Sequence, residues 1–432
     1  MLRLYFLGVE PTLAEQRSDL RLILKNGTLI DGNGGKPLTG VDVTIADGKV
    51  ERIIESQAAS GGVPETEAVD CSGKFILPGL IDSHVHLAFE PYSDHESVIR
   101  QMLTDSDQML ALREMRHAQQ CLLAGITTVR DCGGKGFGTL AVRDATAAGM
   151  LPGPRIMASG MPITTTFGHL YFCGLEVDGI DQVRVAVRRL AKSGADFIKV
   201  MATGGMMTAS PNPGTPRYTQ AELDALCEEA RMLDKRVAAH VGSAEGIRRC
   251  VLAGVKTIEH CGWGNPDGSS GYDPKLVEVM AAKEVFVGAT MPGLTRNLLR
   301  PGGQLTDSER QRRLEELYRG WQSFRTMKAA GVPFTLSSDA GVRDTPFDEI
   351  HLSLKLYSLM MDASPLETIS AITQEGARAL GIERACGTIE PGKMADILVL
   401  DADPLQDLDN VRRVALVIRE GKPVVLQGRL LL

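Results

Sequence analysis

The stretch FILPGLIDSHVHL, residues 75–87, combines an apolar run of strand length with two histidines at its end. In a strand, residues two apart point to the same side, so His84 and His86 can face one site together. Two imidazoles placed in this way can bind a metal ion. A lone His-x-His pair is more often a hydrogen-bonded structural pair, so the rest of the chain has to decide between these interpretations.

Seven further apolar runs of strand length follow, and helical patterns separate them. The runs are ITTVRDC (126–132), RIMAS (155–159), FIKVMA (197–202), RVAAHV (236–241), TIEHC (257–261), VFVGAT (285–290) and FTLSSDA (334–340). Strands that alternate with helices are typical of a parallel α/β fold. Eight such units in about 300 residues predict a (β/α)₈ TIM barrel, with a doubly wound sheet as the alternative. No G-x-G-x-x-G turn follows the first strand, which removes the main reason to prefer that alternative.

The predicted helices carry recognisable end signals. Thr219 and Glu222 form a capping box, and residues 364–367 combine a serine N-cap, a proline at the first helical position and a box glutamate. Apolar residues recur at helical spacing after Asp181. Four glycines stand where a helical pattern ends before the next strand, as C-terminal caps do: Gly125, Gly194, Gly254 and Gly331.

Both ends of the chain are rich in strand patterns. In residues 21–56, Asn26-Gly27 and Asp47-Gly48 separate alternating apolar runs and predict hairpin turns. The C-terminal stretches ADILVLDADP and VALVIREGKPVVLQGRLLL repeat this style, with Glu420-Gly421 at a turn. The spacing allows either two small sheets or one composite sheet.

Composition narrows the class of protein. The chain has 432 residues, 43% of them hydrophobic and 23% charged, and a formal charge of −7, which is ordinary for a globular protein without a nucleic-acid partner. The apolar start MLRLYFLG soon gives way to Glu10 and lacks a cleavage site, and no apolar stretch is long enough to span a bilayer. The eight cysteines are scattered without a CxxC pair. We therefore expect a cytoplasmic protein with reduced thiols and no membrane partner.

Residues of the types that bind metals recur at the ends of later strands. His240 ends the fifth predicted strand, His260 the sixth and Asp339 the eighth, whereas Lys199 lies within the fourth. The carboxyl ends of barrel strands meet at one mouth, where active sites form. Imidazole and carboxylate suit Zn²⁺, Mn²⁺ and similar ions, so the pattern predicts a metal site. Lys199 could be paired with a carboxylate, act as a nucleophile or be a modified ligand, because a buried ammonium is costly.

Taken together, these motifs resemble the amidohydrolase superfamily. The resemblance runs from about residue 21 to the C-terminus and is carried by LPGLIDSHVHL (77–87), FIKVMATGG (197–205), AAHV (238–241), IEHC (258–261), SSDA (337–340) and GTIEPGKMADILVLDADP (387–404). It implies a (β/α)₈ barrel over residues 78–377 and a composite β-sandwich made from residues 1–77 and 378–432.

The resemblance also implies a binuclear metal centre. His84, His86 and Asp339 would hold the more buried ion, and His240 and His260 the second. Lys199 would bridge both as an N6-carboxylysine formed with CO₂. The ions expected are Zn²⁺, with Mn²⁺, Co²⁺ or Fe²⁺ as alternatives. Relatives in this superfamily often form symmetric oligomers, so a homo-oligomer is expected.

The likeness is strongest to a branch of carboxypeptidase-like Xaa-Pro and Xaa-Arg dipeptidases that includes ochratoxinase-like enzymes. Tyr218 matches the branch's tyrosine that approaches the scissile carbonyl, and His169 matches a Gly-Gly-His segment in which Phe167 replaces the first glycine. This predicts hydrolysis of an amide bond in dipeptides or N-acyl amino acids, including ochratoxin-like aryl amides. Carbamates, ureas, esters or cyclic amides are alternative substrates, and a non-catalytic binding protein is a remote one.

The expected mechanism uses a metal-bound hydroxide as the nucleophile. Asp339 would take the proton of the nucleophile and pass it to the leaving amine, while Tyr218 would help to polarise the carbonyl. For Tyr218 the alternative is a partly exposed residue before a helix N-cap, and for His169 it is a histidine that packs within its loop.

Four residues are candidates for substrate contacts. Phe167 would reshape the pocket, and Met206, with Met207, would give the loop after the fourth strand an apolar lining. Arg296 or Arg300 could bind a substrate carboxylate, although a solvated charge is the commoner role of an arginine. The remaining histidines (His95, His117, His351) and the cysteines Cys173, Cys250 and Cys261 are not expected to be ligands.

Overall fold

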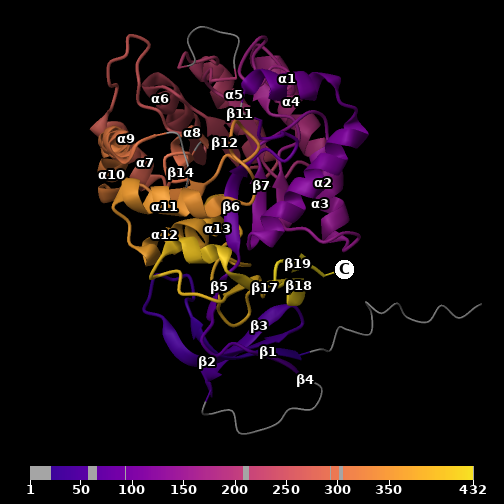
Figure 1. The fold of residues 1–432 in the computed structure, drawn as a ribbon. Helices are drawn as coiled ribbons and strands as arrows, with labels where there is room; N and C mark the ends of the chain where they lie inside the picture. The colour runs from indigo at the N-terminus through magenta and orange to yellow at the C-terminus, as the bar shows by residue number, and fades with distance from the viewer. Residues whose placement is uncertain are drawn as a thin grey trace, which may run out of the picture.

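Two groups of elements make up the fold in this computed structural model, which describes residues 21–56, 66–92, 94–207, 214–291, 293–300 and 305–431. Strands from both chain ends form one sheet, and helices with parallel strands between them form the larger part (Figure 1). The segment MLRLYFLG and residues 208–213 of the loop after the fourth strand lie outside the described residues.

The sheet built from both chain ends joins nine strands of the described residues in the order β19-β18-β17-β16-β5-β1-β2-β3, with β4 paired to β1. Its strands are β1 (Arg21–Leu29), β2 (Leu38–Ala46), β3 (Lys49–Glu55), β4 (Thr66–Asp70), β5 (Phe75–Pro78), β16 (Ile397–Leu400), β17 (Val414–Arg419), β18 (Lys422–Leu426) and β19 (Arg429–Leu430). The two ends meet where β5 pairs antiparallel with β16. Of the two arrangements that the spacing allowed, the chain therefore adopts the composite sheet.

Two of the three predicted turns of this sheet are confirmed and one is wrong. Asp47-Gly48 joins β2 to β3, and Glu420-Gly421 joins β17 to β18. Asn26-Gly27 instead lies inside β1, where the register with β2 shifts between Leu24 and Gly27. Asn26 has φ +58° and its backbone N–H donates to Asp42 Oδ1 at 2.9 Å, so the pair forms a bulge. A Cβ on Gly27 would overlap Ile76, which explains the glycine.

The stretch 75–87 is divided between the two parts of the fold at Gly79. Its first half is β5 in the composite sheet, and its second half is β6 (Leu80–Val85), which pairs in parallel with β7. The Gly79 N–H donates to the Asp396 carbonyl at 2.9 Å, and a Cβ at this position would overlap Thr127. The glycine therefore lets the chain pass tightly from one sheet to the other.

Except for the short strand β10, the parallel strands of the larger part follow the chain order, as in a TIM-barrel-like α/β fold. They are β6, β7 (Ile126–Asp131), β8 (Arg155–Ala158), β9 (Ile163–Thr164), β10 (Leu175–Glu176), β11 (Ile198–Met201), β12 (Val237–His240), β13 (Thr257–Glu259), β14 (Phe286–Thr290) and β15 (Phe334–Ser337). One sheet has the order β6-β7-β8 and the other β10-β9-β11-β12-β13-β14-β15. A parallel bridge joins Val85 to Ala340, so the first and last of these strands also meet.

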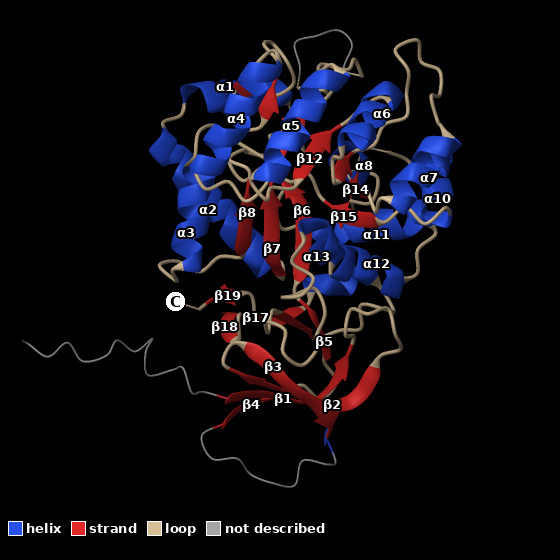
Figure 2. Ribbon diagram, turned by 180° about the vertical axis from the view of Figure 1, so that it is seen from behind, coloured by secondary structure: helices blue, strands red, loops and turns tan. Residues whose placement is uncertain are grey.

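Helices surround these strands in both views (Figure 2). They are α1 (His95–Thr104), α2 (Asp107–Leu123), α3 (Gly138–Ala147), α4 (Ile180–Lys192), α5 (Gln220–Met232), α6 (Ala244–Ala253), α7 (Pro274–Ala282), α8 (Gly293–Arg296), α9 (Asp307–Gly320), α10 (Gln322–Ala329), α11 (Ile350–Met361), α12 (Pro365–Ile372) and α13 (Gln374–Leu380), with a 3₁₀ helix at Leu408–Arg412. The capping boxes predicted before α5 and α12 are confirmed. The four predicted cap glycines all have positive φ, between 83° and 94°.

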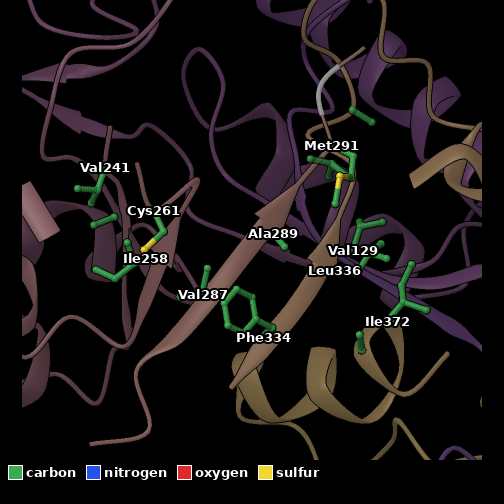
Figure 3. Packing of buried hydrophobic residues seen from close by; sticks show 14 of the residues in the cluster. Val129, Val241, Ile258, Cys261, Val287, Ala289, Met291, Phe334, Leu336 and Ile372 are labelled. Atoms are coloured by element: carbon green, nitrogen blue, oxygen red, sulfur yellow. The ribbon is translucent and has the colours of Figure 1, made fainter. Parts of the chain in front are cut away.

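The main hydrophobic core lies between the parallel strands and the helices. All five residues of β14 are buried, because a parallel strand is covered on both faces. Figure 3 shows Val287 and Ala289 of β14 near Phe334 and Leu336 of β15, with Ile372 of α12 beside them. This packing fixes the strand ends at which the histidines stand. Within the described ranges, no helix combines the length and apolarity that a bilayer crossing needs.

Candidate metal centre and active site

Three predicted ligands meet at the carboxyl ends of β6 and β15. Asp339 Oδ1 lies 3.5 Å from His84 Nε2 and 3.6 Å from His86 Nε2. The Asp339 N–H donates to the His84 carbonyl at 2.9 Å, and the His86 N–H donates to the Ala340 carbonyl at 2.8 Å. These backbone bonds hold the three side chains together, with one ligand atom of each within 4.8 Å of the others.

The ring orientations of His84 and His86 suit metal binding. Their Nδ1 atoms lie 2.9 Å from Glu259 Oε2 and 2.7 Å from the Gly133 carbonyl, so each ring donates from Nδ1 and turns the lone pair of Nε2 toward Asp339. Burial, with the charge of Lys199, lowers the pKa of His86 to about 3 and that of His84 well below its usual value. Neutral imidazoles, which metal ions require, are therefore favoured.

A second histidine pair lies beside the first. The rings of His240 and His260 are 4.5 Å apart between centroids, and the rings of His84 and His260 are 5.3 Å apart. His240 Nε2 lies 3.1 Å from the Gly204 carbonyl, and His260 Nδ1 lies 2.6 Å from Thr290 Oγ1. Each ring thus uses one nitrogen for a hydrogen bond, and the other could bind a metal ion.

Lys199 completes the group from the middle of β11. Its side chain is fully buried, and Nζ lies 3.3 Å from His84 Nε2. All six predicted metal-binding residues therefore gather at the carboxyl ends of the parallel strands.

The donor set fits divalent cations. Asp339 Oδ1 is buried and accepts no hydrogen bond from the described residues. Burial raises the pKa of Asp339 to about 7. The charge of Lys199 opposes this shift, as does that of Arg296, whereas Glu259 and Asp82 add to it. A buried, unpartnered carboxylate oxygen facing two imidazole nitrogens is what a cation would satisfy.

His169 also reaches this group. Its ring centroid lies 4.3 Å from that of His240, and its side chain is buried. A Cβ on Gly205 would lie 2.6 Å from His169 Cε1 and 2.7 Å from His240 Nε2, so a glycine is needed where the loop after β11 passes both rings. The catalytic role assigned to His169 stays a prediction.

Tyr218 points elsewhere. Its side chain is 1% exposed, and its hydroxyl donates to the Val177 carbonyl at 3.1 Å. The phenol packs in the main hydrophobic core, and burial, with Asp178 and Glu222 nearby, raises the pKa of Tyr218. Tyr218 thus lies directly before the N-cap of α5, which favours the structural alternative, but it is buried and not partly exposed as that alternative expected.

We expect Tyr218→Phe to change stability more than turnover. The substitution leaves the Val177 carbonyl without its donor, which should lower the free energy of unfolding by ~1 kcal/mol. The turnover number should stay within about threefold of the parent value, since contributions of a proton-transfer or oxyanion group are far larger. Denaturant unfolding and steady-state kinetics check both values, and a hundredfold fall in turnover would restore the catalytic assignment.

The arginines considered for substrate binding are engaged within the protein. Arg296 is fully buried, and its guanidinium donates to Ser353 Oγ at 3.2 Å and to the Pro346 carbonyl at 3.3 Å. Arg300 pairs with Glu349 and donates to the Asp344 carbonyl at 3.1 Å. Neither is the solvated charge that a lone arginine suggests. Phe167 and Met206, in contrast, are exposed.

The other histidines and the cysteines have structural surroundings. His117 Nδ1 lies 2.7 Å from the Leu87 carbonyl, and its ring stacks on Phe347 at 4.2 Å. His351 is buried on α11, and His95 begins α1. The eight cysteines are free and buried.

Sequence reasoning missed Glu259 and Arg130, which support His84. Glu259 is fully buried, accepts from His84 and pairs with Arg130, whose Nε donates to the Ser83 carbonyl at 2.6 Å. Burial opposes ionisation of Glu259, but Arg130 and Lys199 outweigh it and lower the Glu259 pKa. Gly288 leaves the space for the carboxylate, since a Cβ there would overlap it. The available signal was a carboxylate inside a buried strand, directly before His260.

We expect Glu259→Gln to weaken metal binding by about 10- to 100-fold, as changes behind a ligating histidine typically do. The amide keeps the shape but removes the charge that fixes His84 and pairs with Arg130. Glu229→Gln is the matched control, because Glu229 is also buried and pairs with Arg184 and Arg188 between α4 and α5, away from the histidines. Competition with a chelator measures the affinity, and equal affinities in both variants would contradict the supporting role.

Comparison with known proteins agrees with this site. The model of the amidohydrolase family matches residues 75–424. An ochratoxinase from Aspergillus niger is 27% identical over 421 residues, covering 89% of this chain and 82% of the relative, and an imidazolonepropionase from Geobacillus kaustophilus is 25% identical, covering 97% and 94%. The structure of a Xaa-Pro dipeptidase with bound methionine in its active site superposes with a TM-score of 0.78 at 28% identity, covering 93% and 99%. The chain belongs to the amidohydrolase family, and it is a hydrolytic enzyme.

Proposed function

We propose that this enzyme is a binuclear metal-dependent hydrolase that cleaves the C–N bond of a small amide, in the class of dipeptides and N-acyl amino acids. The observation that carries the proposal is the buried, unpartnered Asp339 Oδ1 facing the Nε2 atoms of His84 and His86, beside a second histidine pair and Lys199. Similarity to a Xaa-Pro dipeptidase and to an ochratoxinase supports amide-type substrates.

The six residues divide between two ions. His84, His86 and Asp339 would hold the first ion, His240 and His260 would hold the second, and Lys199 would be a ligand shared by both as a carbamate. We expect Zn²⁺, with Mn²⁺, Co²⁺ and Fe²⁺ as alternatives. When bound, such ions act as Lewis acids that acidify water and polarise a carbonyl.

The side chains of this chain supply the proton transfer and the orientation. Asp339 accepts the proton that the attacking water loses and delivers it to the nitrogen of the leaving amine. Glu259 and the Gly133 carbonyl fix the rings of His84 and His86. His169, whose ring packs against that of His240, would contact the substrate.

The same proposal includes the architecture around the site. We infer that eight strands, β6–β8 and β11–β15, close into one (β/α)₈ barrel. The bridge from Val85 to Ala340 supports this, as does the hydrogen bond from the Asp196 N–H to the Ala158 carbonyl at 2.9 Å. The barrel spans residues 78–377. Residues 1–77 and 378–432 form the smaller domain, supported by the pairing of β5 with β16.

A hydrolysis screen tests the proposal. The purified protein is loaded with Zn²⁺ or Mn²⁺ and offered dipeptides, N-acyl amino acids, carbamates, phenylureas and esters, while elemental analysis gives its metal content. The expected result is two ions per chain and turnover of at least one dipeptide or N-acyl amino acid. Turnover restricted to carbamates, ureas or esters would replace the amide assignment, and a metal-free protein without any turnover would overturn the proposal.

A further inference from the structure

An exposed phenylalanine stands beside the candidate active site in a backbone conformation that disfavours it. Phe167 follows β9 by three residues, and its side chain is 57% exposed. Its φ is +60°, in the left-handed region that bulky side chains rarely adopt. Neither burial nor relaxed backbone geometry therefore accounts for a phenylalanine here, and such strain is concentrated at functional sites.

The surrounding loop holds Phe167 in this conformation. The Phe167 N–H donates to Glu176 Oε1 at 2.6 Å, and the Thr166 N–H donates to Asp178 Oδ1 at 3.2 Å. The Thr166 hydroxyl also donates to Asp178. Two carboxylates from the segment that leads into α4 thus hold the backbone N–H groups of the two successive residues Thr166 and Phe167.

A row of aromatic rings connects Phe167 with a metal-binding residue. The Phe167 ring lies 5.6 Å from that of Tyr171, which lies 5.7 Å from that of Phe172. The Phe172 ring is 6.0 Å from that of Phe89, and Phe89 stacks on His86 at 4.8 Å. Phe89 and Phe172 are buried, whereas Tyr171 is half-buried, so the row reaches solvent only at Tyr171 and Phe167.

The segment that carries Phe167 also contacts the histidine cluster. His169, two residues after Phe167, packs against His240, and Gly205 packs against both rings. The next residue, Met206, is 76% exposed. The loops after β9 and β11 thus each carry an exposed apolar side chain within two residues of a residue that packs against His240.

We propose that Phe167, supported by Tyr171, is a specificity-determining residue that stacks on an aromatic ring of the substrate outside the metal centre. The preferred substrates are then small amides that carry an aromatic ring. This inference rests on the proposed amide hydrolysis, which it makes more specific. Offset or edge-to-face ring contacts add selectivity for an aromatic over a saturated ring beyond what apolar area alone gives.

The test compares ligands that differ only in aromaticity. Calorimetry on the metal-loaded protein measures binding of 3-phenylpropionate and 3-cyclohexylpropionate, which the enzyme does not hydrolyse. Steady-state kinetics then compare the two N-acylglycines in which these acids are joined by an amide bond to the amino group of glycine. We expect the aromatic member of each pair to be favoured by about three- to tenfold. Phe167→Asn should reduce that preference to less than twofold, through Kd and KM rather than kcat.

The variants are chosen to keep the fold. Asparagine and glycine both tolerate positive φ, so Phe167→Asn and Phe167→Gly should unfold at or above the parent melting temperature. Met150→Asn is the matched control, because Met150 is 74% exposed and lies in the turn between α3 and β8, at the other end of the strands. It should leave both preferences unchanged.

Each outcome separates this inference from the proposed function. Hydrolysis without an aromatic preference, or with one that survives both Phe167 variants, overturns the inference and leaves amide hydrolysis standing. A preference in binding that Phe167→Asn abolishes, in a protein that hydrolyses none of the amides, supports the aromatic subsite and removes the proposed reaction. A smaller mass in sedimentation for both Phe167 variants, with the ligand preference unchanged, would make Phe167 a contact between copies and overturn the inference.

Discussion

Asp339→Asn should lower the turnover number by about 10²- to 10⁴-fold, which is the range that a positioned proton-transfer group contributes. Asparagine has the shape of aspartate but cannot accept and return a proton. Asp339 Oδ1 accepts no hydrogen bond from the described residues, so the amide replaces no structural contact of that oxygen. Asparagine also tolerates the φ of +60° found at Asp339, and the fold should therefore be kept.

Steady-state kinetics and elemental analysis on the same sample separate the two roles of Asp339. Lost turnover with retained metal points to proton transfer, whereas loss of both points to ligation. The control is Asp234→Asn, because Asp234 is exposed, lies between α5 and β12 and also has positive φ. Near-normal turnover in Asp339→Asn would remove this residue from the reaction.

The positions of the metal-binding residues could be predicted because they depend on topology alone. His84, His86, His240 and His260 stand at or just after the carboxyl ends of parallel strands, and those ends converge whatever the loops do. The local signals that were confirmed are of the same kind. A capping box and a cap glycine act within a few residues, so the sequence around them suffices.

Features that depend on contacts between distant segments were missed or misjudged. Asn26-Gly27 has the composition of a turn, but it forms a bulge within β1, where the side chain of Ile76 from β5 packs against Gly27. Arg296 looks like a surface charge in the sequence, and only the approach of Pro346 and Ser353 reveals a buried guanidinium. Glu259 is 175 residues from His84, so no local pattern joins them.

Lys199→Ala should remove at least one of the two ions and most of the hydrolysis, with an effect as large as that of Asp339→Asn. Lys199 is fully buried among the histidines, where a bare alanine methyl offers no ligand atom. In the proposed carbamate, Nζ bonds to the carbon of CO₂ and loses one proton, which gives two oxygen ligands in place of an amine. Anionic oxygens stabilise paired cations where an ammonium would repel them.

A small carboxylate should partly replace the side chain that Lys199→Ala removes. The space left by Lys199→Ala can admit a short carboxylate, so acetate or propionate should restore part of the metal content and activity. Lys192→Ala, on the exposed side of α4, should retain full metal content and show no response to acetate. ¹³C NMR after incubation of the parent protein with ¹³CO₂ should show a carbamate signal that Lys199→Ala lacks. Two ions per chain in Lys199→Ala, by elemental analysis, would exclude a bridging role for this lysine.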